Sequence, residues 1–169
     1  MKLKDMNSLL TYEVKDLLNA ERQLVKALPE MAQAASNGQL RQAFESHLEE
    51  TKGHVQRLET VCERLSIDAA DNDEQCEAMQ GLIEEGQEVI GAEGDDAVRD
   101  AALIAAAQRV EHYEMAGYGA ARSFAQHLGR NDVADLLQQT LDEEGAANEK
   151  LTKLAIDWVN DRAVQETQG

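Results

Sequence analysis

"RVEHYEMAGYGAARSF", residues 109–124, contains the feature that decides the fold. The stretch has the spacing of a helix, and its apolar stripe should face a neighbouring helix. Glu111 and Glu114 nevertheless lie within that stripe, three residues apart, where a core position usually holds leucine or isoleucine. Burying an ionised carboxylate without a partner is costly, so these two residues require partners in the interior.

The rest of the chain consists mainly of residues that favour helices. Its 169 residues are 43% hydrophobic and include a single proline. Alanine, leucine, glutamate and glutamine dominate, and all four are good helix formers. A chain of this length can bury a sizeable core. The sequence therefore predicts an all-α protein in which residues 1–169 form one domain.

The charge balance excludes several classes of partner. The formal net charge is −17, from 33 acidic and 16 basic residues. Nucleic acids and anionic membranes both require positive charge, so neither is an expected partner. Cys62 and Cys76 have no CxxC spacing, and the N-terminus shows no signal region or spanning segment. We expect a cytoplasmic protein.

Apolar residues recur three and four positions apart in four long segments. Two breaks separate them into pairs, "SNGQ" at 36–39 and "LGRND" at 128–132. The last segment runs through Trp158, which we place on its apolar stripe, and the tail after it should fray. The main helices are predicted at 6–36, 39–65, 97–128 and 132–160.

Residues 66–96 connect the two pairs of helices. This stretch is too long for a tight turn, and "CEAMQGLIEEGQEVIG" within it has the pattern of a short helix. Two helical hairpins joined by such a connection form a bundle with one long crossover. The predicted fold is a ferritin-like four-helix bundle with a long crossover that contains a short helix between the second and third main helices.

Further acidic residues share the core-facing stripes. At about 100° per residue, Glu21 lies at the centre of the buried face of the first helix. Glu144 lies among the apolar positions of the fourth helix. Together with Glu111 and Glu114, four carboxylates therefore face the core from three helices.

The second helix offers a less regular set in "ESHLEETKGH", residues 45–54. His47 and His54 lie near one edge of its apolar stripe, and Glu50 lies further out. This helix still directs one carboxylate and two imidazoles to the same side.

These residues are expected at similar heights along the bundle axis, measured from the hairpin tips. Glu21 lies about 16 residues before the first hairpin tip and Glu50 about 13 after it. Glu114 lies about 16 residues before the second tip and Glu144 about 14 after it. We therefore expect the acids to meet in one layer of the bundle.

A layer of buried carboxylates needs positive charge or protons. Arg122 is the only obvious cationic side chain in these stripes, and it lies two turns past Glu114. Two divalent ions would balance four carboxylates, and oxygen ligands with one or two imidazoles suit iron, with manganese as the alternative. The other explanation is a polar layer that shares protons and fixes the helix register.

The ligand spacing departs from the usual pattern of such sites. That pattern takes one Glu from each of two helices and Glu-x-x-His from the other two. Here the third helix carries Glu111-x-x-Glu114, and the second carries His47-x-x-Glu50. The fourth helix has no histidine after Glu144.

Several blocks of the chain resemble the YciE/YciF-like family of bacterial stress proteins, part of the ferritin-like superfamily. They are "LLNAERQLVKALPEMA" at 17–32, "HLEETKG" at 47–53, "RDAALIAAAQRVEHYEMAGYG" at 99–119 and "TLDEEGAANEKLTKLA" at 140–155. The resemblance implies a rubrerythrin-like dinuclear metal layer, a homodimer and a role under stress. The metal ligands it implies are Glu21, His47, Glu50, Glu111, Glu114 and Glu144, with His54 as a further candidate.

Two alternatives stay open at the ligand positions. The sequence does not decide which of His47 and His54 binds metal. Glu143 is the register alternative to Glu144, although angular position favours Glu144. Tyr118, one turn from Glu114, is a candidate hydrogen-bond donor to the layer.

Two functions are consistent with these features. The first is a di-iron oxidoreductase that reacts with a small oxidant, peroxide or dioxygen, or that oxidises Fe(II). The second is a non-catalytic dimeric stress protein whose metal or polar core layer is structural. Metal content and oxidant reactivity would distinguish them.

Overall fold

The structure, a computed structural model, describes residues 4–70 and 75–166. All regular structure within these residues is helical, and they contain no strand. A shorter helix lies in the crossover, and a π-helical turn and a short helix come after the last long one. The long helices are α1 (Met6–Ala34), α2 (Gly38–Leu65), α4 (Asp96–His127) and α5 (Asn131–Leu154); the others are α3 (Glu77–Gly91), η1 (Ala155–Val159) and α6 (Asn160–Glu166).

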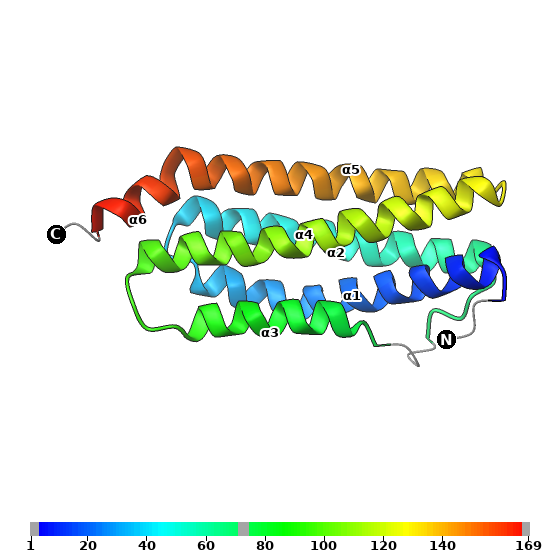
Figure 1. The fold of residues 1–169 in the computed structure, drawn as a ribbon, viewed down its shortest axis with the longest axis horizontal. Helices are drawn as coiled ribbons and strands as arrows, with labels where there is room; N and C mark the ends of the chain where they lie inside the picture. Colours follow the sequence, from blue (N-terminus) through cyan, green and yellow to red (C-terminus); the bar gives the residue numbers. More distant parts are fainter. Residues whose placement is uncertain (1–3, 71–74, 167–169) are drawn as a thin grey trace.

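The long helices pack as two hairpins, α1 with α2 and α4 with α5. α1 also lies against α4, and α2 against α5, which closes the bundle. α3 packs on α1 and α4 and carries the chain back along the outside, so that α2 and α4 begin at the same end (Figure 1). The predicted ferritin-like four-helix bundle with a helical crossover is confirmed.

The apolar core consists of two separate clusters. One contains Leu28, Phe44, Leu103 and Leu151, and the other contains Leu10, Val14, Leu58 and Leu137. Between the two clusters, each of the four long helices carries polar side chains that are buried. The bundle therefore has apolar packing at both ends and a polar layer between them.

Asp100 ties the first hairpin to α4. Its side chain is 2% exposed, and its carboxylate accepts hydrogen bonds from Ser36 N (2.8 Å), Ser36 Oγ (2.6 Å) and Asn37 N (2.8 Å). Asn37 in turn caps α2 through its own side chain, which accepts from Gln39 N and Leu40 N. The backbone N–H groups of the turn between α1 and α2 thus find their hydrogen-bond acceptor in a side chain of another helix.

Cys76 connects the start of the crossover helix α3 to α1 through hydrogen bonds. Its side chain caps α3, its N–H donates to Asn19 Oδ1 (2.9 Å), and its carbonyl accepts from Gln23 Nε2 (3.1 Å). Its sulfur lies 2.9 Å from the Tyr113 hydroxyl, which donates to Asp16 Oδ2 (2.5 Å). Burial raises the pKa of the Cys76 thiol, so the sulfur stays protonated at neutral pH.

The fourth main helix departs from the prediction at its C-terminal end. The chain passes through the π turn η1 and continues as α6 to Glu166, so residues 160–166 are helical rather than frayed. A π turn holds an extra residue and shifts the register of the residues after it. Val159 faces inward and is 2% exposed, whereas Trp158 is 60% exposed. The placement of Trp158 on the apolar stripe was therefore wrong; residues 167–169 of the tail lie outside the described residues.

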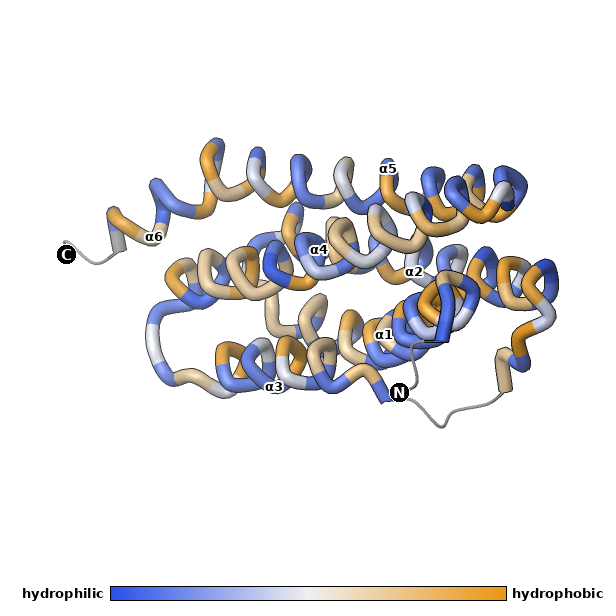
Figure 2. The backbone as a smooth tube through the Cα atoms, turned by 45° about the vertical axis from the view of Figure 1, so that its right-hand side comes forward, coloured by the Kyte–Doolittle hydropathy of each residue, from blue (hydrophilic) through white to orange (hydrophobic). Residues whose placement is uncertain are grey.

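Hydrophilic and hydrophobic residues alternate along every helix (Figure 2). Across residues 4–70 and 75–166, no helix combines the length and the apolar character that crossing a bilayer requires.

Replacing Asp100 with Ala should lower the free energy of unfolding by about 2–3 kcal/mol, because two backbone N–H groups and a hydroxyl lose a charged acceptor. Urea denaturation would measure the change. Asp135→Ala, at an exposed position of α5, is the control and should change stability by less than about 0.5 kcal/mol. Equal effects of the two substitutions would contradict the assigned role of Asp100.

Candidate metal centre

The polar layer receives side chains from all four long helices. Each residue that contributes a side chain to the layer is at most 8% exposed, so the layer is as closed to solvent as the apolar core around it. α2 contributes two imidazoles separated by two helical turns, and α4 contributes two carboxylates separated by one. The contributing residues are Glu21 on α1, His47 and His54 on α2, Glu111 and Glu114 on α4, and Glu144 on α5.

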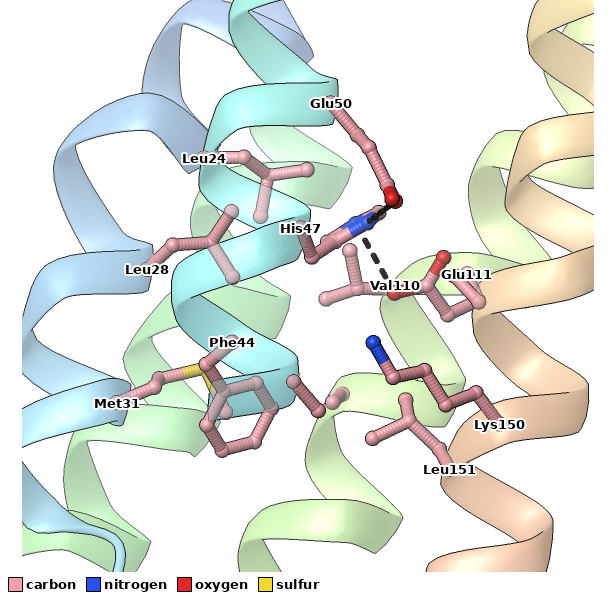
Figure 3. A pocket seen from close by; sticks show the side chains of 13 residues that line it. Leu24, Leu28, Met31, Phe44, His47, Glu50, Val110, Glu111, Lys150 and Leu151 are labelled. Carbon is pink, nitrogen blue, oxygen red and sulfur yellow. Dashed lines mark hydrogen bonds and ion pairs between the residues drawn. The ribbon is translucent and has the colours of Figure 1, made fainter. Parts of the chain in front are cut away.

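Four of these residues form a first group. His47, Glu111, Glu114 and Glu144 each offer a ligand atom, and these atoms lie within 4.8 Å of one another. His47 Nε2 is 3.3 Å from Glu111 Oε1 and 3.8 Å from Glu144 Oε2. Figure 3 shows the imidazole of His47 directed from α2 toward Glu111 on α4. Three carboxylates and one imidazole nitrogen thus converge on one point.

A second group lies beside the first and shares Glu144 with it. Glu21, His54 and Glu144 also offer atoms within 4.8 Å of one another. His54 Nδ1 is 2.9 Å from Glu144 Oε1 and 3.4 Å from Glu21 Oε1. The imidazole rings of His47 and His54 have centroids 6.3 Å apart. Because its two oxygens face different imidazoles, Glu144 has the geometry of a bridging carboxylate.

Each imidazole also contacts a carboxylate outside the layer. His47 Nδ1 lies 3.4 Å from Glu50 Oε2, and His54 Nε2 lies 2.9 Å from Glu143 Oε2. Arg57 Nη1 holds Glu143 in place by donating to the same oxygen at 2.8 Å. An outer carboxylate favours a proton on the nitrogen beside it, which leaves the inner nitrogen able to bind a metal ion.

Tyr118 closes the layer beside Glu21. Its side chain is fully buried, and its hydroxyl donates a hydrogen bond to Glu21 Oε1. Burial and the nearby charge of Glu21 raise the pKa of Tyr118 well above its usual range, so the hydroxyl keeps its proton. The candidate role of Tyr118 as a donor to the layer agrees with this contact.

Burial dominates the electrostatics of the carboxyl groups. It raises the pKa of Glu21 above its usual value, and it raises the pKa of Glu111 and Glu114 well above it. The protein without metal therefore holds protons in this layer, and metal ions must displace them on binding.

The imidazoles respond differently to the same surroundings. Burial lowers the pKa of His47, but the hydrogen bond with Glu50 and the charges of Glu111 and Glu144 outweigh it and raise that pKa to about 9. Burial likewise opposes a charge on His54, whose pKa reaches about 10 through Glu144 and Glu21. Both imidazoles are thus the cations of the metal-free layer.

The buried atoms left without hydrogen bonds test whether the layer fits a metal. Among the described residues, neither oxygen of Glu114 nor of Glu144 makes a hydrogen bond of ordinary geometry, although Glu144 Oε1 lies 2.9 Å from the ion-pair partner His54 Nδ1. The same holds for Glu21 Oε2, Glu111 Oε2, His47 Nε2 and His54 Nδ1. Folded proteins seldom leave buried polar atoms unpaired, and eight of the ten such atoms among the described residues are carboxylate oxygens and imidazole nitrogens of this one layer; the other two are Arg99 Nε and Arg122 Nε. This set fits divalent metal ions.

Six of the seven residues proposed from the sequence lie in the two groups. Glu50 lies at the edge, with a side chain 47% exposed, and its role as a direct ligand stays a prediction. Glu144 is fully buried, whereas the side chain of Glu143 is 35% exposed. Arg122 donates to Gln138 at 2.6 Å and is not part of either group.

Sequence reasoning missed Arg57 and its contacts. Arg57 Nη1 donates to Thr140 Oγ1 (2.5 Å) as well as to Glu143, and so joins α2 to α5 beside His54. Its position three residues after His54 places it on the same side of the helix, and this spacing could have revealed it.

Comparison with known proteins identifies the family. The sequence profile of DUF892, described as a domain of unknown function, matches residues 5–164. The chain belongs to this family. The resemblance to YciE/YciF-like proteins is confirmed by protein YciF of Escherichia coli K12, which is 47% identical over 166 residues, 96% of this chain and 98% of YciF.

Solved structures similar to this chain have the same bundle. The crystal structure of the E. coli stress protein YciF superposes with a TM-score of 0.88 over 93% of this chain and 98% of YciF. YcfI from Rhodopseudomonas palustris, 41% identical, has a TM-score of 0.84 over 89% of this chain and 95% of YcfI. A Xanthomonas campestris protein that is 19% identical, with a TM-score of 0.75 over 96% of this chain and 99% of that protein, supports the fold alone.

Glu114→Met should raise the free energy of unfolding of chelator-treated protein by about 1–4 kcal/mol, because an apolar side chain of similar volume replaces an unpaired buried carboxyl group. Urea denaturation would measure the change. Leu103→Met, in the core part of the same helix, is the control and should cost less than about 1.5 kcal/mol. If Glu114→Met proved more destabilising than the control, the carboxyl group would be a source of stability rather than a cost.

Proposed function

We propose that this YciF-like stress protein binds two divalent metal ions in the polar layer and reacts there with a small oxidant. The observation that carries the proposal is the set of unpaired, buried carboxylate and imidazole atoms contributed by four helices. Nothing but protons or cations can offset so many electron-pair donors in a region closed to bulk solvent. Metal ions satisfy both the charge and the lone pairs.

The two groups define the proposed ligand sets. One ion would be held by His47, Glu111 and Glu114, and the other by Glu21 and His54. Glu144 would bridge the two ions, since it belongs to both groups. Four carboxylates balance two divalent ions in charge, and the mixture of oxygen and imidazole ligands favours iron, with manganese as the alternative.

The chain's own residues prepare this site for chemistry. Glu50 and Glu143 orient the imidazoles, and Arg57 fixes Glu143. The Tyr118 hydroxyl stabilises negative charge on Glu21 in the interior. The apolar clusters on both sides keep bulk water away. Bound reduced metal ions would supply electrons to peroxide or dioxygen, or Fe(II) itself would be the substrate that is oxidised.

The relatives support the biological setting. YciF of E. coli is described as a stress protein, and removal of a small oxidant is consistent with that description. A cytoplasmic setting, expected from the sequence, belongs to the same proposal.

The second candidate is a structural metal layer without turnover. The layer joins α1, α2, α4 and α5, so two bound ions would crosslink the whole bundle at its midpoint. This alternative is favoured by the closure of the layer, in which each of the six convergent residues is at most 8% exposed.

Metal analysis tests the proposal directly. Protein purified without chelator should contain about two iron or manganese ions per chain. Glu144→Ala should reduce the content to below one per chain, because both groups lose a ligand. Glu149→Ala, at an exposed position just over one turn later on α5, should leave the content unchanged. Elemental analysis and anaerobic Fe(II) titration provide the measurements.

Oxidant reactivity then separates the two candidates. Fe(II)-loaded wild-type protein should be oxidised by peroxide or dioxygen faster than free Fe(II), as followed by absorbance in stopped flow. Metal bound at the expected ratio but inert to both oxidants would favour the structural layer. Wild-type protein that binds neither iron nor manganese would overturn both candidates.

The homodimer implied by the family resemblance also belongs to the proposal. Ile156 and Trp158 are 65% and 60% exposed, and an interface would cover such apolar side chains. Wild-type protein should sediment as a dimer, and Trp158→Ser should shift it toward the monomer. A wild-type monomer at all concentrations would rule the dimer out.

A further inference from the structure

A cavity of about 30 Å³ adjoins the first ligand group. It lies among α1, α2, α4 and α5, and His47 and Glu111 form one side of it (Figure 3). Nine of its thirteen lining residues are apolar, among them Leu24, Leu28 and Phe44, each at most 3% exposed. The interior thus contains unfilled apolar space directly beside two proposed metal ligands.

Alanines from three helices create this space. Ala43 on α2, Ala107 on α4 and Ala147 on α5 line the cavity at core-facing positions where larger apolar residues would otherwise fill it. Protein interiors are usually packed to crystal density, so small residues meeting from three helices leave a gap that the fold does not require. The gap has a size and position that suit a ligand.

The outer edge of the cavity is charged. Lys150 on α5 and Glu50 on α2 also line it, and both are exposed. Figure 3 shows the Lys150 side chain extending toward His47 and Glu111. These two flexible side chains lie where a small molecule from solvent would enter, and the apolar lining begins behind them.

We propose that this cavity is a dioxygen-binding pocket that supplies the metal layer, and that dioxygen rather than peroxide is its substrate. The inference rests on the proposed metal site. A space of this volume accommodates one or two water-sized groups, which suits a diatomic molecule.

Polarity separates the two oxidants. Hydrogen peroxide has two donors and several acceptors, and the nine apolar residues of the lining offer them no partner. Dioxygen forms no strong hydrogen bonds with water and so loses none on entry. In the reaction, dioxygen would accept one electron from each of two reduced ions and two protons from solvent, and it would leave as hydrogen peroxide.

Xenon tests the cavity without any metal. Xenon is an apolar atom that occupies dry cavities, so crystals of chelator-treated protein kept under xenon pressure should show a xenon peak between Phe44, Val110 and Leu151. Ala107→Leu should abolish that peak. If the wild-type cavity held ordered water and no xenon, the inference would be wrong.

Oxidation kinetics of the Fe(II)-loaded protein test whether the cavity favours dioxygen over peroxide. Ala107→Leu should slow oxidation by dioxygen by about tenfold or more and change oxidation by peroxide by less than about twofold. Ala106→Leu is the matched control, because Ala106 does not line the cavity beside His47; it lines a neighbouring space of about 20 Å³ under α3 that shares Leu24, Met31 and Val110 with that cavity. It should leave both rates unchanged, and metal content should be the same in all three proteins.

The outcomes distinguish the inference from the proposed function. Equal slowing of both oxidants in Ala107→Leu, or wild-type protein inert to dioxygen, would overturn the dioxygen pocket while leaving the metal site intact. Wild-type protein without metal affinity would overturn the proposed metal site and the pocket's role together, whatever the xenon result.

Discussion

The interior of this bundle is organised around the cost of burying carboxylates. Glu21, Glu111, Glu114 and Glu144 are each at most 2% exposed, and each would cost several kcal/mol if ionised without a partner. A domain is stable by only about 5–15 kcal/mol in total, so the apolar clusters on both sides must offset this layer. The fold retains an internal region that weakens it unless protons or cations offset the carboxylates.

Much of this arrangement was predictable from the sequence. Helical periodicity alone placed Glu21, Glu111, Glu114 and Glu144 on core-facing stripes, because an acid inside a stripe of leucines is visible without a structure. Counting residues from the hairpin tips set them at one depth, since the rise per residue of a helix is constant. Angular position also favoured Glu144 over Glu143, and Glu144 is the buried one.

Other features depend on packing that a single helix does not reveal. His47 and His54 lie near the edge of their ideal stripe but are buried, because a real helix drifts from ideal angles and long side chains reach inward. The turn η1 turned Trp158 away from the core and Val159 toward it, and no local pattern signals a π turn. Asp100 was missed because its partners are backbone groups of a distant turn.

The two halves of the layer are not equivalent, and the difference indicates where chemistry would occur. Beside Glu21 and His54 the layer is closed by the buried Tyr118 and by Glu143, which is fixed to Arg57. Beside His47 it adjoins a cavity whose edge carries the exposed Glu50, whose contact with His47 is the longer of the two outer contacts, 3.4 Å against 2.9 Å. Under the proposed function, the half beside Tyr118 and Arg57 would hold its ligands rigidly and the half beside the cavity would admit a small molecule. A purely structural layer would gain nothing from that asymmetry, since equal closure on both sides would hold two ions more firmly.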